Sequence, residues 1–255
     1  MKRILVIGEC CTDEFVYGEV NRLSPEAPVP ILKPIEMVSN LGMAGNVSKN
    51  IAALDPECEI ILQHQDELIV KRRFVENKSN HMFLRVDEGE NNIKPLEWDY
   101  YMDSFIAQAD AVVVSDYNKG YLTAAHLKEI ARKSKLSILD SKRDLTDDIV
   151  KDFTFIKLNE SERNRNLHLS HRGIITTIGS KGAIYDGELI PQENPQQTID
   201  VSGAGDTFVA AFILSFLDNL EVIPSIEFAN EMAGEVVSKR GVVTPNKNGK
   251  VHTSI

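Results

Sequence analysis

The run Ile199–Phe216 constrains the fold of this chain more than any other stretch. Its second half, Val209–Phe216, is an unbroken apolar segment of the kind that forms a buried helix. The small residues Gly203, Ala204 and Gly205 come before it, where the helix would begin. Glycines allow a sharp turn, and the first N–H groups of a helix lack partners within it. This corner is therefore suited to an anion.

Asp206 adds a carboxylate to the first turn of this expected helix. A carboxylate there competes with a bound phosphate unless it has a separate task, such as accepting the proton of an attacking hydroxyl. An anion cradle with a base beside it predicts phosphoryl transfer. Alternatively, Asp206 only caps a core helix and the glycines only permit close packing.

The charge balance narrows the class of partner. The chain has 28 basic and 38 acidic residues, a net charge of −10, and no basic block. This argues against nucleic acid or an anionic membrane as the main partner, and an anionic substrate would need a locally positive site. Because no linker or repeat divides the 255 residues, we expect a single α/β domain over residues 1–255.

The apolar segments and the cysteines bear on the compartment. No stretch approaches the roughly 20 apolar residues of a membrane span, and the N-terminus does not resemble a signal peptide, so we expect a cytoplasmic protein. Cys10, Cys11 and Cys58 are odd in number and lack Cys-x-x-Cys spacing. Neither a disulfide framework nor a zinc site is supported.

Two apolar strand patterns lead into polar residues. Ile4–Ile7 is followed by Asp13, and Ala111–Val114 is followed by Asp116 and Lys119. In open parallel sheets such strand ends meet at one edge, which is where ligands bind. Asp13 can accept hydrogen bonds from two sugar hydroxyls there, or it can merely cap a turn.

The composite Asp-x-x-Gly-Ala-Gly-Asp, which ends at Asp206, resembles the signature of the ribokinase-like (PfkB) carbohydrate kinases. The resemblance implies a three-layer α/β/α fold with a mostly parallel sheet and a small β lid, with lid segments near residues 12–38 and 69–88. It also implies that Asp206 is the catalytic base and that the backbone of Gly203, Ala204 and Gly205 holds the transferring phosphoryl group of Mg-ATP.

Three segments narrow the resemblance to the kinase domains of bacterial heptose 7-phosphate kinases. They are Arg22–Pro30, the Leu-Arg-Val-Asp of Leu84–Asp87, and the Ser-Asp-Tyr-x-Lys-Gly of Ser115–Gly120. By this resemblance Arg85, with other lid cations, binds the substrate's own phosphate, and Asp116 and Lys119 are second-tier substrate contacts. Alternatively, the lid cations only solubilise edge strands.

The stretch Leu41–Leu54 places small residues before an expected amphipathic helix, with Asn46 in the first turn of that helix. Gly42 and Asn46 match the family's Gly-Gly-x-x-x-Asn, but Met43 replaces the second glycine. A side chain at that position narrows the pocket or displaces the loop. Asn46 is otherwise an ordinary helix-cap amide.

Asn159 and Glu162 resemble the family's Asn-x-x-Glu, which implies that they hold the water shell of Mg²⁺. Without a metal, the same residues read as a capping box. Lys142, in a match to the family's Asp-Pro-Lys, either faces nucleotide phosphates or lies on a surface loop.

One glycine-rich segment and one helical segment resemble the parts of this family that bind the nucleotide. Thr177, Gly179 and Gly182 resemble the family's Thr-x-Gly-x-x-Gly, although alone they would indicate a hairpin turn. Asn230, in a last helix expected over Ser225–Arg240, resembles the adenine-side segment.

The chain is contracted relative to this family. After Leu54 about one α/β unit is missing, and Arg163–Arg172 is short where relatives have a full helix. We expect an ATP- and Mg²⁺-dependent kinase of heptose 7-phosphate that forms 1,7-bisphosphate, with the lid pairing two subunits. The alternatives are a kinase for another sugar or a nucleoside, and a non-catalytic relative that binds sugar or nucleotide.

Overall fold

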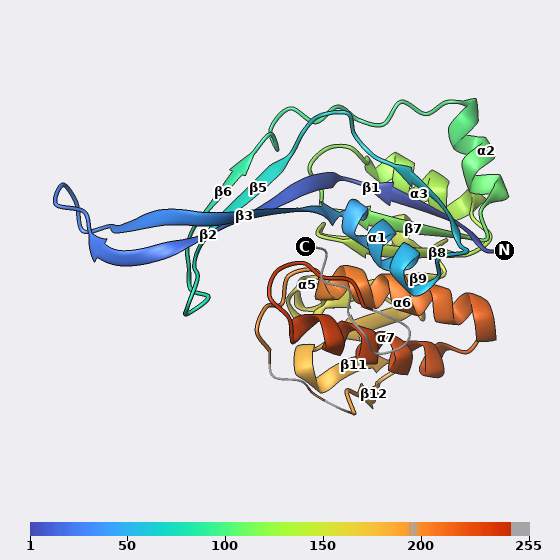
Figure 1. Ribbon diagram of the computed structural model, residues 1–255. Helices are drawn as coiled ribbons and strands as arrows, with labels where there is room; N and C mark the ends of the chain where they lie inside the picture. The colour runs from blue at the N-terminus through green and yellow to red at the C-terminus, as the bar shows by residue number, and fades with distance from the viewer. Residues whose placement is uncertain (194, 196–197, 246–255) are drawn as a thin grey trace.

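The body of the molecule is a sheet covered by helices on both faces (Figure 1). The computed structural model describes residues 1–193, 195 and 198–245. Among these residues the sheet has eight strands in the order β12-β11-β10-β9-β8-β7-β1-β4. Their bounds are β1 Arg3–Gly8, β4 Glu59–Gln63, β7 Ala111–Asp116, β8 Ser137–Ser141, β9 Phe155–Asn159, β10 Ile174–Thr177, β11 Gly182–Tyr185 and β12 Glu188–Pro191.

Six neighbouring strands, from β4 to β10, run parallel, and β11 and β12 extend the sheet as an antiparallel hairpin. The central strands β7 and β8 are buried along their whole length. Burial on both faces explains why their sequences are continuous apolar runs rather than alternating patterns.

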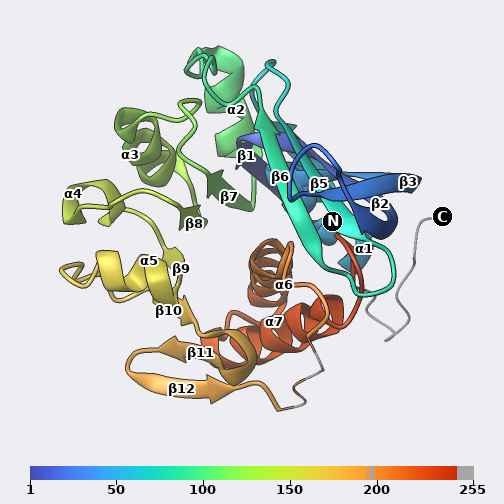
Figure 2. The same ribbon diagram turned by 90° about the vertical axis from the view of Figure 1, so that its left-hand side faces the viewer.

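Two apolar clusters place the helices on opposite faces of the sheet. Ile4 and Val6 of β1 pack with α1 (Ala44–Leu54), α6 (Ala204–Asn219) and α7 (Val222–Val237). Leu5 and Ile7 of β1 pack with α2 (Tyr100–Gln108), α3 (Ala124–Lys133) and α4 (Asp147–Val150). The short helix α5 (Glu160–Arg165) lies on the same side as α2 to α4 (Figure 2). The expected three-layer α/β/α fold with a mostly parallel sheet is confirmed.

A second sheet forms the lid and projects away from the body (Figure 1). It has four strands in the order β3-β2-β5-β6. Their bounds are β2 Cys10–Leu23, β3 Pro30–Met43, β5 Val70–Glu76 and β6 Met82–Glu88. These strands occupy the segments expected to form the lid; that body and lid fold as one domain stays a prediction.

The long strand β3 illustrates how a proline shapes an edge. Pro34 removes a backbone donor, which predicts an edge or bulged strand. Both features are present: β3 is at the edge of the lid, and its register with β2 shifts between Tyr17 and Gly18, which pair with Glu36 and Pro34. The hairpin therefore bends where the sequence predicts.

The main contraction lies between α1 and the lid strand β5. After α1, β4 runs beside β1 as an edge strand of the body, and the chain then passes directly into β5 of the lid. Helix α5 has only six residues, which agrees with the short segment expected there. Among the described residues no helix is long and apolar enough to cross a membrane.

The starts of two helices follow from local features. Helix α2 begins at Tyr100, because Asp99 caps it by accepting a hydrogen bond from the Met102 N–H. Helix α7 begins at Val222, before the expected Ser225. Its Pro224 lies in the first turn, where a missing N–H has no intrahelical partner to lose.

Candidate active site

The N-terminus of α6 lies beside strand ends of the body and carries the predicted phosphoryl cradle. Gly203 precedes the helix with φ 81°, the left-handed region that favours glycine. A Cβ added to Gly203 would lie 2.6 Å from Asn46 Nδ2, and one added to Gly205 would lie 2.9 Å from Lys157 Nζ. The Ala204 N–H donates a long hydrogen bond of 3.3 Å to Val201 O. Gly203 is therefore favoured by its backbone conformation and by the nearby Asn46 amide, whereas a side chain at Gly205 would displace the end of Lys157.

Asp206, in the first turn of α6, is 6% exposed and is held by two donors. Asn46 Nδ2 donates to its Oδ2 at 2.8 Å, and the Tyr117 hydroxyl donates to its Oδ1 at 3.3 Å. Burial raises the pKa of Asp206 to about 6, although the Asn46 hydrogen bond opposes this. The carboxylate is therefore ionised near neutral pH but is a stronger base than an exposed aspartate.

Asn46 is not a helix-cap amide. The residue that precedes α1 is Met43, whose side chain makes no capping hydrogen bond, and Asn46 instead bonds to Asp206. Its Oδ1 is buried without a hydrogen-bond partner. A buried amide oxygen in this position is suited to a ligand hydroxyl.

Met43 stands where the family has its second glycine. It adopts φ 58°, so the backbone keeps a conformation that glycine adopts easily. Its side chain is buried in a small apolar cluster with Cys11 and Ile69. The methionine is accommodated by packing rather than by leaving the left-handed conformation.

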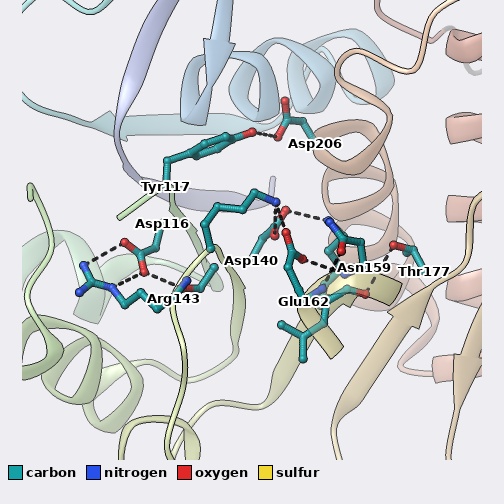
Figure 3. A network of polar contacts seen from close by, with 12 residues as sticks. Asp116, Tyr117, Asp140, Arg143, Asn159, Glu162, Thr177 and Asp206 are labelled. Atoms are coloured by element: carbon teal, nitrogen blue, oxygen red, sulfur yellow. Dashed lines mark hydrogen bonds and ion pairs between the residues drawn. The ribbon is translucent and has the colours of Figure 1, made fainter. Parts of the chain in front are cut away.

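A network of charged side chains follows β8 and β9 (Figure 3). Lys157 Nζ donates to Asp140 Oδ2 at 3.0 Å, and Lys142 Nζ donates to Glu162 Oε1 at 2.5 Å. The pKa of Lys142 is raised: burial lowers it, but the carboxylates of Asp140 and Glu162 outweigh that effect. Two ammonium groups are thus held near the start of α6, which is where phosphates would need them.

Asn159 and Glu162 form a capping box at the start of α5. Each side chain accepts a hydrogen bond of 2.8 Å from the other residue's backbone N–H. The structure therefore shows the capping box that was the alternative to a metal-binding role. Glu162 has one oxygen in this box and the other on Lys142; its role toward a metal stays a prediction.

A cavity of about 190 Å³ brings together the residues predicted to bind the nucleotide. Its walls include Thr177, Gly179, Gly182 and Asn230, and also Ala204 and Gly205 of the predicted cradle. The glycine loop is at the same time a turn, since Gly179–Lys181 connects the antiparallel strands β10 and β11. Asn230 Nδ2 donates to Ile190 O at 3.1 Å. Segments that are far apart in the sequence thus share one cavity.

Asp13 and Gly42 meet on the lid side. Asp13 lies inside β2, which rules out the turn-capping alternative, and its Oδ1 is 2.5 Å from Arg73 Nη1. A Cβ added to Gly42 would lie 2.1 Å from Asp13 Oδ2. The register of β2, β5 and β6 places Asp13, Lys71, Arg73 and Arg85 on one face.

A second cavity, of about 220 Å³, lies under the lid. Its walls include Phe15, Tyr17 and Asn40 from the lid together with Asn46 and Arg240 from the body. Because Asn46 touches both this cavity and Asp206, the cavity between lid and body adjoins the predicted base.

Three predicted contacts are already paired. Asp116 is fully buried, and Arg143 Nε and Ser141 Oγ both donate to it at 2.6 Å, so it points away from the base (Figure 3). Its role as a second-tier substrate contact stays a prediction; in this structure its partners enclose the carboxylate. Arg85 pairs with Asp87 at 2.7 Å, and Lys119 pairs with Glu90 at 2.5 Å.

Sequence reasoning missed Tyr117, Lys157 and Glu9. A lysine inside the apolar segment Phe153–Leu158 was a signal, because a buried ammonium needs an anionic partner. Tyr117 lies inside the quoted Ser-Asp-Tyr-x-Lys-Gly motif, but its contact with Asp206 spans 89 residues of sequence. No local pattern indicates such a pair.

The chain is similar to known kinases in sequence. The profile of the pfkB family carbohydrate kinases matches residues 59–248. The bifunctional protein HldE of Helicobacter pylori (strain ATCC 700392 / 26695) is 31% identical over 304 residues, which covers 94% of this chain and 64% of that protein. The HldE of a Nitratiruptor species is 29% identical over 292 residues, with 95% and 63% covered. The chain thus spans less than two thirds of these relatives.

Two solved structures share the fold. Arabidopsis thaliana ribokinase, complexed with ribose and ATP, has a TM-score of 0.72 at 15% identity, covering 97% of this chain and 96% of its own. Escherichia coli phosphofructokinase-2, in complex with potassium, has a TM-score of 0.74 at 14% identity, with 97% and 96% covered.

The alignment to the Helicobacter protein also confirms the contraction. It extends over 304 positions, although this chain has only 255 residues, so the relative carries insertions that this chain lacks. Despite these deletions, the profile match covers most of the chain. The chain therefore belongs to the pfkB family of carbohydrate kinases.

Proposed function

We propose that this kinase transfers the γ-phosphoryl group of ATP to a hydroxyl of a phosphorylated sugar, with heptose 7-phosphate as the acceptor. The arrangement around Asp206 is the observation that carries the proposal. Its buried carboxylate lies at the glycine-flanked start of α6, between Asn46 on the acceptor side and the nucleotide-side cavity. A base in this position can reach both reactants.

The residues act by proton transfer and charge stabilisation. Asp206 accepts the proton of the attacking hydroxyl, whose oxygen then bonds to the γ-phosphorus while the bond to the β,γ-bridging oxygen breaks and ADP leaves. Backbone N–H groups at the start of α6 and the Lys157 ammonium, close to Gly205, stabilise the charge on the transferring group.

The side chains near the nucleotide also fit Mg²⁺. Asp140 Oδ1 is buried without a hydrogen-bond partner, 3.7 Å from Lys142 Nζ, and Glu162 supplies a second carboxylate. Mg²⁺ keeps several waters and needs only one or two protein carboxylates besides the phosphates. Bound there, it would neutralise phosphate charge during transfer.

The lid supports a phosphorylated acceptor. Arg73 and Arg85 lie directly opposite each other in the β5–β6 register, on the same face as Lys71. Like charges in this position repel, and the structure offsets them with Asp13 and Asp87. A substrate phosphate would serve as their shared counterion, which a neutral sugar cannot do.

The test is an ADP-release assay with Mg-ATP over free sugars and sugar phosphates, repeated without Mg²⁺. We expect heptose 7-phosphate to give the highest kcat/KM and turnover to require the metal. Asp206→Asn should lower kcat at least about a hundredfold, because it removes the general base, while ATP binding measured by calorimetry stays unchanged.

The matched control is Asp218→Asn, at the far end of the same helix, where the carboxylate pairs with Lys2. It should retain full activity. Turnover of only unphosphorylated sugars would reject the acceptor but keep the kinase mechanism. Full activity of Asp206→Asn would reject the mechanism itself.

We also propose that the outer face of the lid joins two copies of this chain. Met37, Val16, Phe74 and Leu84 are paired in register and form an apolar row across all four strands. Met37 and Leu84 at the ends of this row are 62% and 55% exposed. Covering such a row with its own copy would remove apolar area from water and protect the edge strand β3.

A further inference from the structure

We propose that Tyr117 is a positioning residue for the base: its hydroxyl fixes the orientation of the Asp206 carboxylate, and Glu9 holds Tyr117 in place. The inference rests on the proposed role of Asp206. Tyr117 follows β7, whereas Asp206 lies in the first turn of α6, so the contact joins the two sides of the site (Figure 3).

Two donors are needed to hold this carboxylate. A carboxyl group rotates about its bond to Cβ, and a single hydrogen bond restricts that rotation only weakly. Asn46 from α1 binds Oδ2 at 2.8 Å, and Tyr117 binds Oδ1 at 3.3 Å. The shorter bond anchors the group, and the longer bond sets its plane while leaving Oδ1 able to accept the substrate proton.

The tyrosine ring is held from several directions. It packs against the small cluster of Cys11, Met43 and Ile69. Lys71 Nζ from the lid and Lys142 Nζ from the nucleotide side lie 5.2 Å and 5.5 Å from the ring centroid. These contacts restrict the ring, and its hydroxyl bonds to Asp206.

Glu9 anchors the backbone that carries this ring. It is fully buried, and its two oxygens accept hydrogen bonds from three backbone N–H groups. The Tyr117 N–H donates to Oε2 at 2.8 Å, and the N–H groups of Lys119 and Tyr121 donate to Oε1 at 3.0 Å and 3.2 Å. A buried carboxylate satisfied in this way fixes the whole turn after β7.

The hydroxyl of Tyr117 keeps its proton and can donate it in a hydrogen bond. Burial, followed by the nearby Asp206 carboxylate, raises the pKa of Tyr117 well above its usual value of 10. It remains protonated wherever Asp206 is ionised, so it stabilises the charged base and does not compete for the substrate proton. The titratable groups that also face Asp206 are Asp140, Lys142, Lys157, Cys10 and Cys11.

The direct test is the titration of Asp206, followed by carbon NMR of protein labelled at the aspartate carboxyl carbon. The signal that disappears in Asp206→Asn assigns the residue. In Tyr117→Phe, which keeps the ring but loses the donor, the midpoint should rise by about 0.5–1 pH unit. Tyr121→Phe is the matched control, because its hydroxyl contacts Gln63 instead.

Kinetics supply the second readout. Tyr117→Phe should lower kcat about fivefold to thirtyfold with KM for the sugar nearly unchanged, and Tyr121→Phe should leave both as they are. An Asp206 midpoint that is the same in Tyr117→Phe and the unaltered protein would overturn the inference. If the unaltered protein phosphorylates no sugar, the proposed function fails, but the titration still decides the role of Tyr117.

Discussion

Burial of Asp206 makes its carboxylate a stronger base and lowers the stability of the folded protein once that carboxylate is charged. Its pKa is about 6, raised from 3.8 chiefly because the folded protein takes its charge out of water. Because the folded state holds this proton more tightly than the unfolded state does, stability falls as pH rises from about 4 to 6. At neutral pH the folded protein therefore carries the full free-energy cost of a buried, charged Asp206.

Removal of this charge should therefore stabilise the protein while destroying activity. We expect Asp206→Asn to raise the free energy of unfolding at pH 8 by up to roughly 3 kcal/mol, a difference that disappears near pH 4. Urea unfolding at both pH values measures it. Equal stability of the two proteins at pH 8 would show that the carboxylate is not strained by burial.

At the scale of single elements, the start of α6 depends on the space around Gly203. An alanine there adopts φ 81° at a cost of about 1–2 kcal/mol, and its Cβ would also displace the Asn46 amide from Asp206. We expect Gly203→Ala to lower kcat at least about tenfold. Steady-state kinetics together with urea unfolding separate the two effects.

Gly187 provides the control for backbone strain. It has φ 79°, but an added Cβ there would meet nothing within 4 Å. Gly187→Ala should lose similar stability and keep its activity. A similar kcat for the two variants would show that the cradle tolerates a side chain at Gly203.

The elements that the sequence predicted well are those with local signals. Helix α3 begins after Thr123, because Thr123 forms a capping box with His126, three residues later. The glycines before α6 and the proline in β3 also act through their own backbone. Fold class and much of the site follow from such signals, combined with the family resemblance.

What the sequence could not predict depends on register and on long-range pairing. Asp116 was predicted as a second-tier substrate contact, and no local pattern indicated that Arg143 and Ser141, from the neighbouring strand end, enclose it. Lys157 and Asp140 pair because β8 and β9 are adjacent. Side chains on adjacent strands therefore decide whether a polar side chain at a strand end faces the pocket or pairs with its neighbour.

At the scale of the whole molecule, the apolar row on the lid should hold two subunits together. We expect the protein to sediment as a dimer and Met37→Asp to convert it to a monomer, because a charge in the row cannot be buried without a partner. Analytical ultracentrifugation measures this. Leu189→Asp, at another exposed apolar position on β12, should leave the dimer intact. A monomeric unaltered protein would contradict the proposed pairing.

The sequence distance between the base and its two partners has a consequence for synthesis. Asp206 lies 160 residues after Asn46 and 89 residues after Tyr117, and the lid strands end at Glu88. A ribosome makes the lid, Asn46 and Tyr117 long before the base. On the proposed mechanism, a nascent chain therefore carries the residues of the acceptor side without the base, and phosphoryl transfer has to wait until α6 docks beside α1.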